Sequence, residues 1–152
     1  MHNLIRLALF LAGLGTANAL TPPLDNSPGF FAGEWAGNGE QGSYCYLKLN
    51  TDGWGWVLVD GGAGDWQGAR IQWRNRQQAL QVEKITPLAA SAQLRIMPLE
   101  RFGISTGFNQ SLRLNWNEQS GVCQMQKIET TARNLVRARG AIEALPQGER
   151  SR

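Results

Sequence analysis

The side chains that most often carry out catalysis are scarce in this sequence. The only histidine among the 152 residues is His2, which lies in a predicted leader segment. Once that leader is removed, the chain lacks the commonest general base and the usual zinc ligand, which excludes Ser-His-Asp and Cys-His mechanisms. The remaining candidate acid–base groups are the carboxylates Glu34, Glu40, Asp52, Asp60, Asp65, Glu83, Glu100 and Glu118. Most of them lie beside Gly or Asn in turn-forming sequence, so we expect no catalytic residue, metal site or cofactor.

The two cysteines point to a structural bridge. Cys45 and Cys123 are the only cysteines, and they lie far apart rather than in a Cys-x-x-Cys motif. In an oxidising compartment an even pair most simply forms one disulfide. We therefore predict a disulfide between Cys45 and Cys123.

The first 19 residues have the features of a secretory signal peptide. Arg6 supplies positive charge, residues 7–14 form a short apolar run, and Ala17-Asn18-Ala19 fits a cleavage site. No later stretch approaches the roughly 20 apolar residues of a membrane helix, so we expect no integral membrane segment. Removing Arg6 lowers the 15 basic residues to 14 against 12 acidic ones, a weak balance that does not suggest a nucleic-acid partner. These features predict a periplasmic or secreted protein.

Six tryptophans give the strongest indication of binding. Alternation places Trp54 and Trp56 on one face of a strand, and Trp73 and Trp116 at inward positions of theirs. Three interpretations remain open: hydrophobic core, the lining of a ligand cavity inside a barrel, and an exposed platform for sugars. The candidate ligand-binding residues are these four tryptophans. Trp66, within a Gly-rich stretch, is predicted to be exposed and to contact a ligand or partner.

Apolar residues recur with the period of two that is typical of β-strands. Residues 44–50 and 54–60 flank Thr51-Asp52-Gly53 and predict an antiparallel hairpin, with Cys45, Leu47 and Leu49 on one face. The further predicted strands are 30–37, 69–74, 80–83, 93–98, 112–116 and 122–129, whereas 99–109 has no clear pattern.

These strands predict an all-β fold, an antiparallel meander of about eight strands. A disulfide from an early strand to the last one favours a closed barrel over a sandwich. The predicted divisions are an extended lead-in at 20–29, the barrel at 30–129, a C-terminal helix at 130–145 and a tail at 146–152. One face of that helix is expected to pack on the barrel through Ala132, Leu135, Val136, Ile142 and Leu145.

The tripeptide Gly33-Glu34-Trp35 on the first predicted strand resembles the Gly-x-Trp motif that opens lipocalins and related calycin barrels. The resemblance implies an antiparallel barrel with a C-terminal helix. It also implies that the barrel binds a small apolar ligand. It further implies that Trp35 packs at the closed end of the barrel under an arginine from the last strands. Arg113 is the best match for that arginine, with Arg133 as the alternative.

We therefore expect a non-catalytic exported binding protein that takes a small apolar ligand in its barrel. The alternative is an envelope protein-interaction module, such as an inhibitor of a secreted enzyme or an accessory to surface assembly. Trp66, Phe102 and Phe108 are its candidate contacts. A minor enzyme, the third hypothesis, requires a pocket with two carboxylates in unlike environments. An enclosed apolar void of about 300 Å³ or more would favour the ligand.

Overall fold

The structure is a computed structural model that describes residues 27–39, 42–62, 64–107, 111–116, 121–128 and 133–150. The predicted leader, most of the lead-in, and Phe108 lie outside the described residues. The described elements, in chain order, are η1 (Pro28–Phe30), β1 (Gly33–Asn38), β2 (Tyr44–Leu49), β3 (Trp54–Asp60), β4 (Trp66–Arg76), β5 (Ala79–Pro87), β6 (Ile96–Pro98), β7 (Phe102–Thr106), β8 (Leu112–Trp116), β9 (Gly121–Lys127), α1 (Arg133–Glu143) and α2 (Gln147–Arg150).

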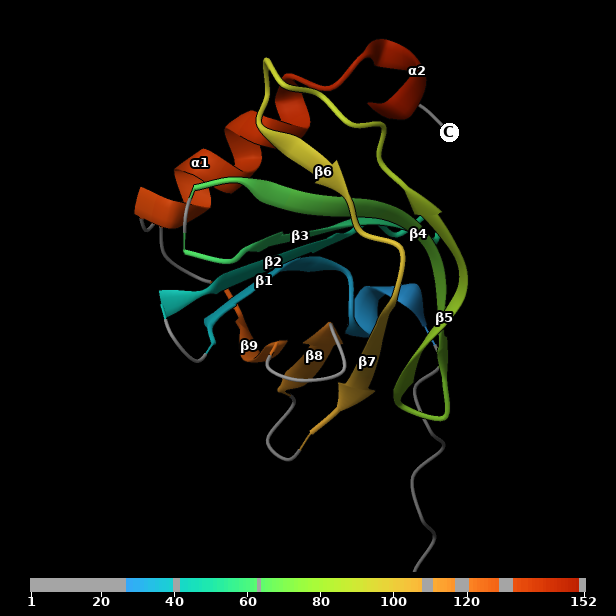
Figure 1. Cartoon of the computed structure of the whole chain (residues 1–152). Coiled ribbons are helices and arrows are strands. Elements are labelled where there is room, and N and C mark those ends of the chain that lie inside the picture. The colour runs from blue at the N-terminus through green and yellow to red at the C-terminus, as the bar shows by residue number, and fades with distance from the viewer. Residues whose placement is uncertain are drawn as a thin grey trace, which may run out of the picture.

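Eight strands form an antiparallel meander that is nearly closed into a barrel, which confirms the predicted fold class (Figure 1). The strand order is β5-β4-β3-β2-β1-β9-β8-β7, so the first and last strands of the chain pair with each other. β6 lies off this path and pairs parallel with the first three residues of β4. Helix α1 packs across the outside of the sheet, where it contacts β2.

The predicted central hairpin is present. Leu49 pairs with Gly55 and Tyr44 with Asp60, and Gly53 takes the positive φ of 85° that the tight turn requires. Cys45, Leu47 and Leu49 share one face as predicted, and that face is the barrel interior, whereas Tyr44 and Tyr46 face outward.

β4 (Trp66–Arg76) and β5 (Ala79–Pro87) extend beyond the predicted 69–74 and 80–83, and two other predicted strands differ from the structure in kind. The segment 30–37 does not begin as a strand, because Pro28 starts the short helix η1 and pairing begins only at Gly33. The segment 93–98 is a strand only at Ile96–Pro98, since Arg95 has a left-handed φ of 54° that interrupts the extended backbone. Within the predicted tail, residues 147–150 form the short helix α2.

Side chains from most of the barrel strands fill its interior. Phe31 from the segment after η1 packs among them and is fully buried. The other buried members of this interior core are Trp35, Cys45, Leu47, Leu49, Val57, Val59, Ala69, Ile71, Trp73, Leu80, Leu99, Leu112, Leu114, Trp116, Cys123 and Met125. The barrel is therefore a packed core, with aromatic and branched aliphatic side chains in the space that a ligand would need.

A second, outer core lies between the sheet and α1. Its buried members are Tyr44, Tyr46, Trp56, Leu58, Trp66, Leu88, Ile96, Leu135, Ala138, Ile142 and Leu145. Because β2 and β3 serve both cores, β3 is buried at six of its seven positions and reads as a continuous apolar run. None of the described helices has the length and hydrophobicity needed to cross a membrane.

The predicted disulfide is present. Cys45 on β2 and Cys123 on β9 are bonded, with Cα atoms 6.2 Å apart, and the sulfur atoms are buried inside the barrel. Gly37 on β1 permits this geometry, because a Cβ there would overlap the backbone carbonyl of Gln124 on β9. The absent side chain lets β9 approach the end of β1 closely.

Candidate functional site

The four tryptophans predicted to line one cavity are divided between the two sides of the sheet. Trp73 and Trp116 lie in the interior core, whereas Trp56 belongs to the outer core beneath α1. Trp54 shares the outward face with Trp56 and is half-buried, with the guanidinium of Arg70 4.9 Å from its ring centre. The four tryptophans therefore do not share one side of the sheet. Alternation gave the shared face of Trp54 and Trp56 but not which side of the sheet that face was on.

Trp66 is buried rather than exposed. Only 4% of its surface is accessible, because it is the first residue of β4 and lies among outer-core side chains. The ring of Tyr44 lies 6.4 Å away and the Arg137 guanidinium lies 5.5 Å from the ring centre. The glycine-rich loop ends one residue before this point, so composition alone assigned Trp66 to the wrong element.

Trp35 lies on β1 in the interior core, 2% exposed, and its indole N–H donates to the Phe31 carbonyl at 2.8 Å. The cation over its ring is Lys127 from β9, with its Nζ 5.8 Å from the ring centre. Arg113, the residue matched from the family resemblance, is exposed on β8 between two inward-facing leucines. The alternative, Arg133, has a side chain outside the described part of the chain.

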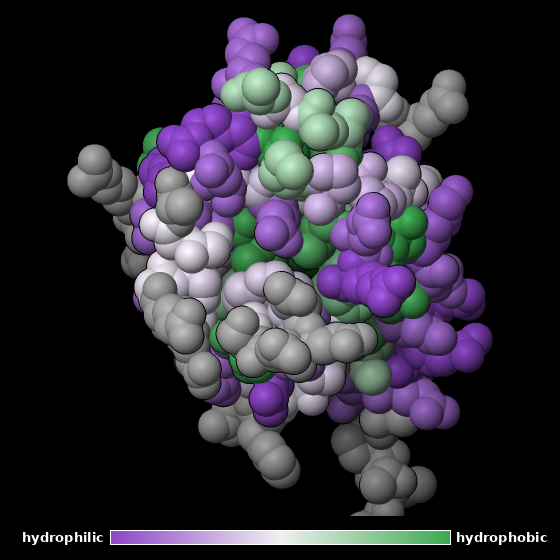
Figure 2. Space-filling model, in the orientation of Figure 1, coloured by the Kyte–Doolittle hydropathy of each residue, from purple (hydrophilic) through white to green (hydrophobic). Residues whose placement is uncertain are grey.

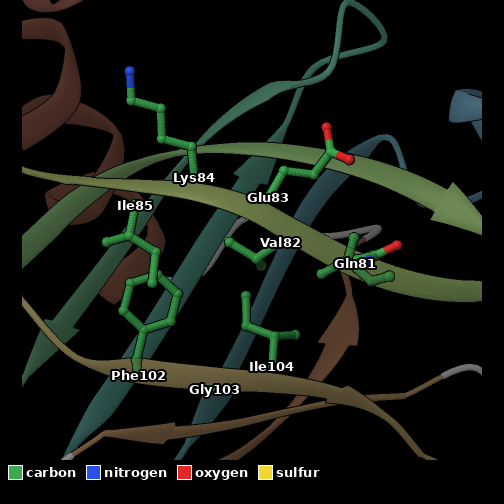
Figure 3. A pocket seen from close by; sticks show the side chains of 9 residues that line it. Gln81, Val82, Glu83, Lys84, Ile85, Phe102, Gly103 and Ile104 are labelled. Carbon is green, nitrogen blue, oxygen red and sulfur yellow. The ribbon is translucent and has the colours of Figure 1, made fainter.

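A groove lies where the meander fails to close, between the edge strands β5 and β7. Its volume is about 470 Å³ (Figure 3). The residues that line it are Leu80, Gln81, Val82, Glu83, Lys84, Ile85, Phe102, Gly103 and Ile104. Figure 3 shows Ile85 and Phe102 pointing toward one another between the strands, with Val82 and Ile104 doing the same further along.

The path of the chain explains this opening. After β5 ends at Pro87, the chain forms β6, which pairs with the first residues of β4. It reaches β7 only after β6. At one end the two edges are joined, since the Leu80 N–H donates to the Thr106 hydroxyl at 3.3 Å. Toward Phe102 no ladder between β5 and β7 is found among the described residues. The groove therefore lies between two strand edges whose backbone N–H and C=O groups do not pair with each other in a ladder toward Phe102.

Apolar side chains form the floor of the groove. Val82, Ile85, Phe102 and Ile104 are half-buried and pack against the interior core. The space-filling view of this side of the molecule shows apolar atoms exposed among hydrophilic ones (Figure 2). The groove is therefore continuous with the core and open to solvent.

Charged residues stand on the outer rim. Glu83 forms an ion pair with Arg74 on β4. The side chains of Glu83 and Lys84 both point away from β7 in Figure 3. Lys84, Arg101 and Glu100 are exposed, and no ion pair of theirs is found among the described residues. The rim at the Phe102 end therefore carries a small net positive charge.

Of the carboxylates that sequence analysis raised as acid–base candidates, Glu34 and Asp60 make structural contacts away from the groove, whereas Glu40 and Glu118 lie outside the described residues. Glu34 accepts hydrogen bonds from the Tyr46 hydroxyl at 2.7 Å and from Arg139 on α1 at 3.0 Å. The guanidinium of Arg139 and the Tyr46 hydroxyl lower the pKa of Glu34, against the burial that raises it. Burial and the hydrogen bond to Glu34 raise the pKa of Tyr46 above its ordinary value of 10.0.

Asp60 is also held by neighbouring groups. Its Oδ1 accepts the N–H groups of Gly62 and Gly64 at 2.8 and 3.0 Å, and Arg137 lies 3.4 Å from its other oxygen. Asp60 thus shapes the glycine-rich loop and ties α1 to β3. Across the described ranges, no three His, Cys, Asp or Glu side chains gather as metal ligands.

Sequence reasoning missed the groove as a site. Phe102 was named as a possible contact, but residues 99–109 showed no clear period because Gly103 interrupts a five-residue strand. The alternation of Phe102 and Ile104 was the only available signal. Searches for related proteins found no matching family model, curated protein or solved structure.

Proposed function

We propose that this protein is a non-catalytic, exported binding protein and that the groove between β5 and β7 is its binding site. The observation that carries the proposal is a pair of strand edges that are joined only at one end and otherwise face each other over an apolar floor. Ordinary proteins protect or cover such edges, because exposed backbone N–H and C=O groups pair readily with another chain.

A polypeptide partner fits this groove better than a small apolar ligand does. The barrel interior is occupied by buried side chains, so the space first predicted for a ligand is filled. The groove offers both apolar side chains and backbone hydrogen-bonding groups, and an extended peptide satisfies both at once. The protein then acts as an envelope interaction module, an inhibitor or an assembly accessory.

Export and the resemblance to calycin barrels complete the proposal. The leader at 1–19 and the Cys45–Cys123 disulfide both suit an oxidising compartment. The resemblance to calycins is supported by Trp35, which is buried on β1 under a cation from the last strand. Here that cation is Lys127, where the family pattern implies an arginine.

The proposal is tested with a variant, called the lock, in which a disulfide is designed to join β5 to β7 across the groove. Val82→Cys together with Ile104→Cys is designed to join the two strands, because these side chains point toward one another. The matched control is Val82→Ser with Ile104→Ser, which removes the same apolar groups without a bond. Random peptides displayed on phage are selected on the wild-type protein and then measured against all three proteins.

We expect selected peptides to lose at least tenfold in affinity for the oxidised lock, about 1.4 kcal/mol, and less for the serine control. Selection that yields no peptide, or peptides that bind the locked protein equally well, would overturn the proposal. A native-state spectrum of each variant by circular dichroism shows that the fold is retained.

A small apolar ligand is the second candidate, because about 470 Å³ lies within the range of ligand pockets. A fatty acid such as palmitate serves as the probe in the same assay. Binding of palmitate to the wild type and not to the lock, together with failure of the peptide selection, would favour this candidate.

A further inference from the structure

We infer that the polypeptide occupant adds to the edge of β7, antiparallel to it, and does not pair with β5. This inference rests on the function proposed above and names the partner's conformation, direction and chemistry. It follows from the unlike character of the two edges that flank the groove.

The edge of β5 carries several features that hinder pairing. The ladder with β4 shifts between Gln72 and Trp73, so Glu83 is the extra residue of a β-bulge. Glu83 and Lys84 are charged and exposed, and the strand ends in Pro87, which has no N–H. A bulge, charges and a proline are the usual means of protecting an edge strand.

The edge of β7 carries none of these features in Phe102–Thr106. The strand has no charged residue and no proline, and its ladder with β8 runs without a shift. A Cβ placed on Gly103 would meet no heavy atom within 4 Å, so no described side chain covers the face of β7 at that point. An uncharged edge with a central glycine is suited to receive a strand.

Direction follows from the strand order. Each neighbouring pair along β5-β4-β3-β2-β1-β9-β8-β7 is antiparallel, so β5 and β7 themselves run in opposite directions. A strand between them is antiparallel to only one. Antiparallel pairing is the more stable per residue, so a strand added to β7 runs antiparallel to β7 and parallel to β5.

The groove also restricts the partner's length and chemistry. The Leu80–Thr106 hydrogen bond closes one end, so the added strand pairs along Phe102–Ile104 and continues past Arg101. Alternate residues of the partner must be apolar to cover Phe102 and Ile104. A carboxylate of the partner at the open end complements Lys84 and Arg101, because their two positive charges outnumber the one negative charge of Glu100.

The experiment uses a synthetic peptide from the selection and the full mature protein labelled with ¹⁵N. Amide hydrogen exchange is measured with and without the peptide. Backbone N-methylation is then scanned along the peptide. We expect at least one amide of Phe102–Ile104 to exchange tenfold or more slowly in the complex, with Val82–Ile85 unchanged. N-methylation should weaken binding at every second peptide position, because only alternate N–H groups face β7.

The charge complementarity is tested with Arg101→Gln and Lys84→Gln. Each should weaken binding of the acidic peptide several-fold and leave its amide analogue unaffected. Slowed exchange on β5 in place of β7, or tolerance of N-methylation throughout, would overturn the inference while leaving the proposed function standing. Failure of every peptide to bind would overturn both.

Discussion

At the scale of single residues, Glu34 shows how a candidate acid–base group becomes a structural one. It lies on β1 and accepts hydrogen bonds from Tyr46 on β2 and Arg139 on α1, so it joins the helix to the sheet. A carboxylate whose oxygens are already held by a phenol and a guanidinium is a poor proton acceptor for a substrate. Its lowered pKa is consistent with this structural role.

We predict that Glu34→Gln lowers the free energy of unfolding by about 1 kcal/mol at neutral pH, since solvent screens part of the contact with the half-exposed Arg139. The folded-state pKa lies below the ordinary 4.5, so the contribution is complete above that value and is lost as pH falls through the folded pKa. Urea unfolding between neutral pH and about pH 3 measures this. The difference between wild type and variant should shrink as the pH falls.

Asp65→Asn is the matched control for Glu34→Gln. Asp65 also accepts a hydrogen bond from an arginine, Arg95, but both side chains are more than half exposed. An exposed pair contributes little, so we expect a change within about 0.5 kcal/mol. A stability difference for Glu34→Gln that stays constant down to pH 3 would contradict the assigned role of its charge.

At the scale of elements, α1 covers the outer core with one narrow stripe. Leu135, Ala138 and Ile142 of α1, and Leu145 just after its end, are buried at spacings of three, four and three residues. Val136 was predicted to share that face but is 56% exposed. One residue further along a helix is rotated by about 100°, which takes Val136 off the stripe.

We predict that Leu135→Ala lowers the free energy of unfolding by about 2–4 kcal/mol, because it leaves a cavity between α1 and the sheet. Val136→Ala, one residue away, is the matched control and should change stability by less than about 0.5 kcal/mol. Denaturant titration followed by tryptophan fluorescence measures both, since Trp56 and Trp66 lie in the same core. Equal effects of the two variants would show that the helix packs through another face.

The elements also show what the sequence could reveal. A period of two predicted most of the strands, the side chains that share a face with Cys45, and the all-β class. It could do so because alternate burial is a local consequence of the pleat. The short strand β7 and the burial of Trp66 were missed, since both depend on neighbours distant in the chain. Which strands become edges is likewise decided by topology, so the groove could not be found from periodicity.

At the scale of the whole molecule, the barrel is joined at the chain's ends and open in its middle. β1 pairs with β9, and the disulfide clips β2 to β9 beside them. The diversion of the chain through β6 then leaves β5 and β7 as the edges. The covalent clip and the groove are therefore separate features of the barrel, with separate consequences when each is altered.

The disulfide should support stability without shaping the groove. It closes a loop with a sequence separation of 78 residues. Replacing Cys45 and Cys123 together by Ala should lower the free energy of unfolding by about 2–5 kcal/mol, chiefly by freeing the unfolded chain. Calorimetry or urea titration measures the loss. Peptides selected on the wild type should bind the folded double variant with unchanged affinity, because the pairing of β1 with β9 holds the ends together without the bond. Lost peptide binding by a variant that is still folded would mean that the clip also sets the spacing of β5 and β7.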